Sequence, residues 1–269
     1  MRLGISTKVL REYSLTEAVK IAGELGYGAV EFWTDDLYAA GNEVDKALVL
    51  CEIYGMQKSV HLLTEDLNIA SFNEGIRKES LRQQKEGIRL AGNIGAATAT
   101  LHPGRKTAKT RSVEEAWKLQ INSISELAVT AEESGVKLCV EGMEQLSGEF
   151  IQTPQDLERV LLEGSHQALA VTLDISHLQT VGDAEDLLRN CSHLPVENVH
   201  ISQSLNGKPH FPLEFEDGEI DYVQALQILQ SFYDDAVIVE GYVAGKGKQI
   251  AESSMRWYQK IVAQLHGRI

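Results

Sequence analysis

Residues 136–175 read VKLCVEGMEQLSGEFIQTPQDLERVLLEGSHQALAVTLDI, and they contain one full repeat of the pattern that decides the fold. Two short apolar runs rich in β-forming residues, VKLCVEG from Val136 and LAVTLDI from Leu169, enclose a segment of helical period. Thr153 followed by Pro154 is the favoured order at a helix start. A strand, a helix and a second strand within these 40 residues predict one unit of a parallel sheet.

The same unit recurs along the whole chain. Ser14 with Glu17, and Ser112 with Glu115, form S-x-x-E capping boxes that mark two further helix starts. No low-complexity linker divides the chain, and eight strands without a boundary favour a closed barrel over an open sheet with two edges to protect. We therefore predict an α/β protein with a single (β/α)8 barrel domain over residues 1–269. The eight strand runs are RLGIS from Arg2, GAVEFW from Gly28, QKSVHL from Gln57, ATATLH from Ala97, VKLCVEG from Val136, LAVTLDI from Leu169, ENVHIS from Glu197 and AVIVEG from Ala236.

Composition narrows the classes of protein that fit. Hydrophobic residues make up 43% of the chain and charged residues 24%, which is ordinary for a soluble globular protein. The net charge of −14 argues against a nucleic-acid partner, although a local basic patch stays open. The three cysteines are widely spaced without a CxxC, which fits a reducing cytoplasm. Since neither a signal peptide nor a long apolar span is evident, we expect a cytoplasmic protein with no membrane partner.

The most informative feature lies at the strand ends, where a Val or Leu is followed by a residue able to bind a metal. Parallel strands in a barrel open on one face, so these side chains are expected to meet in one pocket. Burying these acids and histidines together is energetically unfavourable unless a cation binds them. A lone His or Glu at a strand end more often bonds to a loop than binds a metal. Chance alone would place an Asp, Glu or His at a given strand end about one time in six, yet seven strands end in such a residue. The pairs are Val30-Glu31, Val60-His61, Leu101-His102, Val140-Glu141, Leu173-Asp174, Val199-His200 and Val239-Glu240.

Three neighbouring residues have less certain roles. His177 lies three residues after Asp174 and is expected either to bind metal or to contact the substrate. Glu31 is expected to support a ligand from behind or to bind substrate. Trp33 is interpreted either as an apolar wall against a sugar face or as an anchor for its loop.

These residues stand in phrases that resemble a known superfamily over nearly the whole chain. In order along the chain, the phrases resemble the xylose isomerase-like TIM-barrel superfamily. It includes the endonuclease IV family and related sugar isomerases and epimerases. The phrases are SVHLLTEDLNIAS, TLHPG, CVEGM, VTLDISHLQTVGD, NVHISQS, HFPLEFEDGEIDY and VIVEGY.

The resemblance implies a divalent metal ion, with Mn, Zn, Co or Mg compatible with the ligand types. The endonuclease IV pattern adds a second metal on His61 and His102, bridged by Glu141. That family's third metal uses a histidine matching His177 and an Asp-x-His in a later loop. The epimerase-like metal ligands would be Glu141, Asp174, His200 and Glu240.

In this chain the later loop reads Lys208-Pro209-His210. Lysine at the aspartate position replaces an anionic ligand with a cation, which argues against the third metal and against DNA repair. We instead expect Lys208, His210 and His177 to contact the substrate.

The favoured hypothesis is a metal-dependent isomerase or epimerase of a small carbohydrate, phosphorylated or not. As the resemblance implies, Glu141 and Glu240 would serve as base and acid while the metal stabilises an enediolate. The first alternative is an endonuclease IV-like phosphodiesterase acting on abasic-site DNA, which His61 and His102 favour. The second is a barrel that binds metal or sugar without catalysis. A homo-oligomer is left open.

Overall fold

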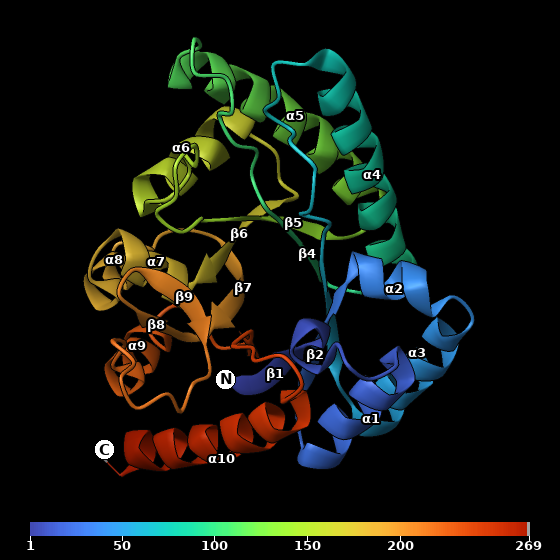
Figure 1. Cartoon of the computed structure of the whole chain (residues 1–269), viewed down its shortest axis with the longest axis vertical. Coiled ribbons are helices and arrows are strands. Elements are labelled where there is room, and N and C mark those ends of the chain that lie inside the picture. The colour runs from blue at the N-terminus through green and yellow to red at the C-terminus, as the bar shows by residue number, and fades with distance from the viewer. Residues whose placement is uncertain (268–269) are drawn as a thin grey trace.

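The structure, a computed structural model, describes residues 1–267 as a barrel of parallel strands with helices around it (Figure 1). Eight strands close in the order β1-β10-β7-β6-β5-β4-β3-β2, which confirms the predicted (β/α)8 barrel. Seven of the predicted strand runs contain one of them, and the run from Glu197 overlaps β7, which begins one residue earlier. The strands are β1 (Arg2–Ser6), β2 (Ala29–Trp33), β3 (Gln57–His61), β4 (Thr98–Leu101), β5 (Lys137–Glu141), β6 (Leu169–Asp174), β7 (Val196–Ile201) and β10 (Ala236–Val239).

Helices cover the outside of the barrel and bury apolar side chains against it (Figure 1). The capping boxes at Ser14 and Ser112 are both formed, and Thr153 caps the helix that begins at Pro154. The helices are η1 (Thr7–Leu10), a 3-10 turn, α1 (Leu15–Leu25), α2 (Thr34–Ala40), α3 (Glu43–Tyr54), α4 (Glu74–Asn93), α5 (Val113–Glu133), α6 (Pro154–Gly164), α7 (Ile175–Val181), α8 (Ala184–Arg189), α9 (Tyr222–Leu229) and α10 (Gly247–His266).

A short antiparallel hairpin after β7 was not predicted. Strands β8 (Gln203–Leu205) and β9 (Lys208–Phe211) pair across the dipeptide Asn206-Gly207. Both turn residues have positive φ, 51° and 71°, as a tight hairpin turn requires. The Asn-Gly pair is typical of such turns, so it was the feature of the sequence that could have predicted the hairpin. The hairpin matters for the site because it carries both Lys208 and His210.

Strand register sets the depth of the candidate site residues. Asp174 lies beside His200, and His61 lies beside Trp33. Glu31 pairs with Ser59, two residues before His61, so it lies one layer deeper in the barrel. Register therefore places Asp174 level with His200 and Glu31 one layer below His61.

No helix within residues 1–267 is long and apolar enough to cross a membrane. That residues 1–269 form one domain stays a prediction, and the last two residues of that range lie outside the described part of the chain.

Candidate metal centre

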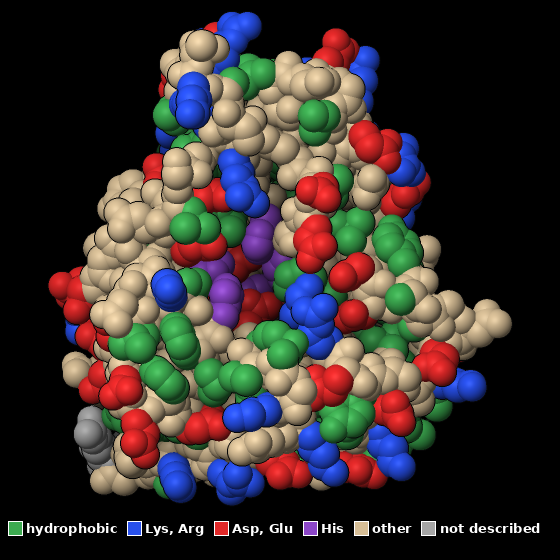
Figure 2. All heavy atoms as spheres, viewed as in Figure 1, with side chains coloured by type: hydrophobic (Ala, Val, Ile, Leu, Met, Phe, Trp, Pro, Cys, Tyr) green, Lys and Arg blue, Asp and Glu red, His purple; other side chains and the backbone are tan. Residues whose placement is uncertain are grey.

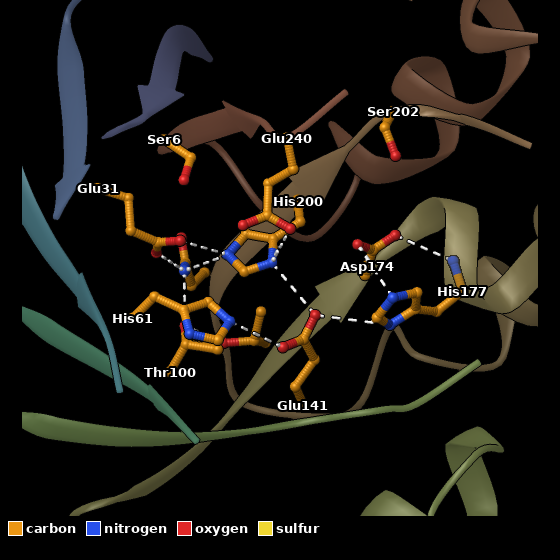
Figure 3. Close-up of polar contacts among 12 residues, drawn as sticks. Ser6, Glu31, His61, Thr100, Glu141, Asp174, His177, His200, Ser202 and Glu240 are labelled. Carbon is orange, nitrogen blue, oxygen red and sulfur yellow. Dashed lines mark hydrogen bonds and ion pairs between the residues drawn. The ribbon is translucent and has the colours of Figure 1, made fainter. Parts of the chain in front are cut away.

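Four side chains from β5, β6, β7 and the end of β10 meet at the bottom of the pocket (Figure 3). Nδ1 of His200 lies 3.2 Å from Oε1 of Glu141 and 3.2 Å from Oε2 of Glu240. One ligand atom from each of Glu141, Asp174, His200 and Glu240 lies within 4.8 Å of all the others. We call these four residues the quartet. None of them is more than 8% exposed.

The quartet fits a divalent cation. Oε2 of Glu141, Oδ2 of Asp174 and Oε1 of Glu240 are buried and have no hydrogen-bond partner. Burying three carboxylates together is unfavourable unless a cation or protons neutralise them. Three carboxylates and one imidazole are a donor set that Zn, Mn, Co and Mg accept. The described residues therefore match the group that the ligand pattern implies.

His200 is oriented so that Nδ1 faces the quartet. Its other ring nitrogen, Nε2, lies 2.9 Å from Oε1 of Glu31. Burial would lower the pKa of His200, but the carboxylates of Glu240, Glu31 and Glu141 outweigh it and raise the pKa well above the usual value. A carboxylate behind a histidine ligand holds the ring tautomer and strengthens the nitrogen as a donor. The buried position of Glu31 thus favours the supporting role over substrate contact.

A polar layer inside the barrel holds Glu31 in turn. Its Oε2 accepts hydrogen bonds from Ser59 Oγ at 3.0 Å and from Asn198 Nδ2 at 2.7 Å. Asn198 also donates to Thr100 Oγ1 at 2.9 Å, and Thr100 lies 2.9 Å from Thr172 Oγ1. Barrel interiors are usually filled by branched apolar residues, so this layer is specialised for the site above it.

Replacing Glu31 by Gln is expected to weaken metal binding about 10- to 100-fold, because His200 loses its anionic partner while the four quartet side chains stay in place. Competition titration with a chromophoric chelator measures the change. Glu197→Gln, on the exposed side of β7, is the matched control and should bind as the wild type does. Equal affinity in the two variants would contradict the supporting role.

A second group shares Glu141 with the quartet. Nε2 of His102 lies 3.0 Å and Nε2 of His61 3.6 Å from Oε2 of Glu141. His61 Nδ1 lies 2.9 Å from the carbonyl oxygen of Leu62, which leaves Nε2 as the free donor. Burial would raise the pKa of Glu141, but His102 and His200 hold it well below the usual value. We call His61, His102 and Glu141 the histidine pair group, which could hold a second ion.

A third group lies on the other side of Asp174. Oδ1 of Asp174 caps α7 by accepting from the backbone N–H groups of Ser176 and His177, so Oδ2 is free to face the pocket. Nε2 of His177 lies 3.2 Å from Nε2 of His210 and 3.7 Å from Asp174 Oδ2. Burial would lower the pKa of His177, but Asp174, Glu141 and Glu144 raise it to about 9.

Two predicted substrate residues lie at the edge of this centre. Trp33 stacks on His61 with ring centroids 4.0 Å apart, and the ammonium group of Lys8 lies 3.9 Å from the Trp33 centroid. Two groups this close occupy opposite faces of the ring, so the arrangement favours an anchoring role for Trp33. Lys208 is exposed on β9. Substrate contact by either residue stays a prediction.

Histidine and acidic side chains line the bottom of a hollow on the face seen in Figure 2. A cavity of about 220 Å³ adjoins it and reaches His102. The strand-end pattern missed two acidic residues of this cavity, Glu144 and Glu149, because both lie in the loop after β5. Asn198 was also missed, although it precedes His200 by two residues and so faces the same way.

Comparisons with known proteins place these features in context. The family profile described as xylose isomerase-like TIM barrel matches residues 19–261. Protein MJ1311 of Methanocaldococcus jannaschii is 25% identical, over 98% of this chain and 92% of its own length. A probable endonuclease 4 of Finegoldia magna is 27% identical over 142 residues, which are 52% of this chain and 48% of that protein.

Solved structures share the fold over nearly the full length. A D-tagatose 3-epimerase-like protein superposes with a TM-score of 0.85 at 23% identity and covers 100% of this chain and 99% of its own. The 3-keto-D-glucoside 4-epimerase YcjR of E. coli superposes with a TM-score of 0.83 at 18% identity, covering 97% and 99%. At these identities the likeness shows the fold.

Proposed function

This chain belongs to the xylose isomerase-like TIM-barrel family, and from that premise we propose that it is a metal-dependent isomerase or epimerase of a small carbohydrate. The reaction would be proton transfer beside a carbonyl group, through an enediolate. One observation carries the proposal: Glu141 and Glu240, from strands well separated in the barrel, both lie 3.2 Å from the same nitrogen of His200. Two carboxylates thus face a single position.

A divalent ion held by the quartet would polarise the substrate carbonyl and its neighbouring hydroxyl group. The two glutamates supply the proton transfers. Epimerisation needs one group to remove a proton from one face of the carbon and another to return it on the opposite face. Oε1 of Glu240 and Oε2 of Glu141 are buried without a hydrogen-bond partner, and Oε2 of Glu141 also lies 3.0 Å from Nε2 of His102.

The comparisons support a carbohydrate substrate. Structures of a D-tagatose 3-epimerase-like protein, an L-ribulose 3-epimerase and a 3-keto-D-glucoside 4-epimerase cover 97 to 100% of this chain. The relative named as a probable endonuclease covers only about half of it.

The test is isotope exchange. Metal-loaded protein is incubated in deuterium oxide with a panel of ketoses, ketose phosphates and aldoses. We expect one product epimer or isomer to carry deuterium at the carbon beside the carbonyl, detected by NMR. Glu240→Gln is expected to abolish this signal. No exchange and no turnover with any member of the panel would contradict the proposal.

A phosphodiesterase is the second candidate, and the histidine pair group favours it. A second ion on His61, His102 and Glu141 would lie next to the quartet, an arrangement suited to activating water and stabilising a leaving oxygen. Incubation with an oligonucleotide that carries one abasic site tests this candidate. Incision of that strand without any carbohydrate turnover would reverse the order of the two candidates.

A further inference from the structure

Glu144 lies in the loop after β5, three residues beyond Glu141, and no strand pattern singled it out. Its Oε2 is buried and has no hydrogen-bond partner, and it lies 3.6 Å from Nε2 of His177. The side chain is 19% exposed. An acid so placed, without a hydrogen-bond donor for its buried oxygen, lacks the partner that burial normally requires.

His177, which Glu144 contacts, belongs to a group of metal-binding type. Asp174, His177 and His210 each offer one ligand atom, and these three atoms lie within 4.8 Å of one another. Nδ1 of His177 lies 3.0 Å from the carbonyl oxygen of Gly142 and donates to it, so Nε2 is the nitrogen that faces the group. Nε2 of His177 and Nε2 of His210 lie 3.2 Å apart, close to the roughly 3.4 Å between two nitrogen ligands of one tetrahedral ion.

Two further observations point to a ligand. Oδ2 of Asp174 is unpartnered, and the Asp174 side chain is wholly buried and directed at the same group. His210 has a φ of 69°, in the left-handed region that a non-glycine residue rarely adopts. The hairpin backbone is thus strained at the residue whose imidazole meets His177, and such strain is concentrated at functional sites.

We propose that Glu144 supplies a carboxylate to a cation site that it forms with Asp174, His177 and His210. It takes the role of the aspartate that the family resemblance expects at position 208. The resemblance alone argues against a metal at this site, because Lys208 stands where an aspartate is expected, whereas Lys208 is exposed and another acid, Glu144, lies beside His177. Two imidazoles and two carboxylates select a divalent ion such as Zn or Mn.

The inference rests on the proposed metal centre, because Asp174 belongs both to the quartet and to the group with His177 and His210. It concerns how the substrate contacts these two histidines. If an ion lies between them, these histidines contact substrate oxygens through that ion rather than directly. Glu144 lies at the edge of the group: its Oε2 is 3.6 Å from Nε2 of His177, and it stands outside the three ligand atoms that lie within 4.8 Å of one another.

The test measures how many metal ions each variant binds. Protein is stripped, reloaded with Zn, freed of loose metal by gel filtration and measured by mass spectrometry. Glu144→Gln and His210→Asn are each expected to hold one equivalent less than the wild type. Glu149→Gln is the matched control, since Glu149 lies in the same loop and also has a buried Oε2 without a partner. It should hold as many equivalents as the wild type.

Loading with Co gives a second readout, because losing a ligand changes the visible absorption of the ion. Unchanged stoichiometry and an unchanged Co spectrum in Glu144→Gln would overturn the proposal. Thermal unfolding of the metal-free variants shows whether each is folded. If Glu144→Gln does not fold, His210→Asn still tests whether the site holds an ion. Metal counting needs no turnover, so a protein that holds the extra ion but acts on no carbohydrate contradicts the proposed reaction alone.

Discussion

Glu141→Gln is expected to lower turnover by about 10³-fold and to weaken metal binding in two places at once. The glutamate gives Oε1 to the quartet and Oε2 to the histidine pair group. An amide keeps the shape but loses the negative charge that both groups share. It also cannot accept a proton from the substrate. Steady-state kinetics and Zn stoichiometry measured on the same preparation check both effects.

Comparing Glu240→Gln with Glu141→Gln separates the part that Glu141 plays in the quartet from its part in the histidine pair group. Glu240 belongs to the quartet but not to the histidine pair group, so its variant should lose turnover and quartet affinity while keeping an ion on His61 and His102. Glu197→Gln is the control on an exposed side of the barrel. Full activity in a metal-loaded Glu141→Gln protein would rule out the proposed acid–base chemistry.

Removal of the metal is expected to lower the melting temperature by about 10 °C. An ion present at about a thousandfold above its dissociation constant stabilises the folded state by roughly 4 kcal/mol, and each kcal/mol shifts the Tm of a chain of this size by about 2–4 °C. The loss has a structural cause, because three buried carboxylates then repel one another. Calorimetry before and after dialysis against a chelator measures it.

Restoring the metal separates this effect from chelator damage. Adding back Zn or Mn should recover the original Tm, whereas the same addition to Glu141→Gln should recover only part of it. An unchanged Tm after metal analysis has shown complete removal would mean that the centre contributes nothing to folding.

The fold was predictable from eight β-rich runs that alternate with helical segments, and the candidate site from the ends of seven of those strands. At these ends the Val or Leu packs against the surrounding helices and the next residue faces the interior of the barrel, so position in the strand determines which side chains converge. His61, Glu141, Asp174 and His200 were found by that rule. The rule requires only local sequence and the parallel direction of the strands.

What the sequence missed depends on contacts between distant segments. The place of Glu31 below the centre follows from its pairing with Ser59 and from a contact with His200 across the barrel. Glu144 lies in a loop with no periodic pattern, and only the folded chain shows that its carboxylate meets His177. Lys208 is exposed on β9, and its contact with substrate stays a prediction.

The two shared carboxylates have a thermodynamic consequence. Glu141 joins the quartet to the histidine pair group, and Asp174 joins the quartet to His177 and His210. An ion taken up by one group withdraws negative charge from the next, so their affinities are linked, and the linkage is reciprocal. The ions are therefore expected to bind stepwise with falling affinity. Partial occupancy is then an ordinary state of the protein, set by the supply of free metal.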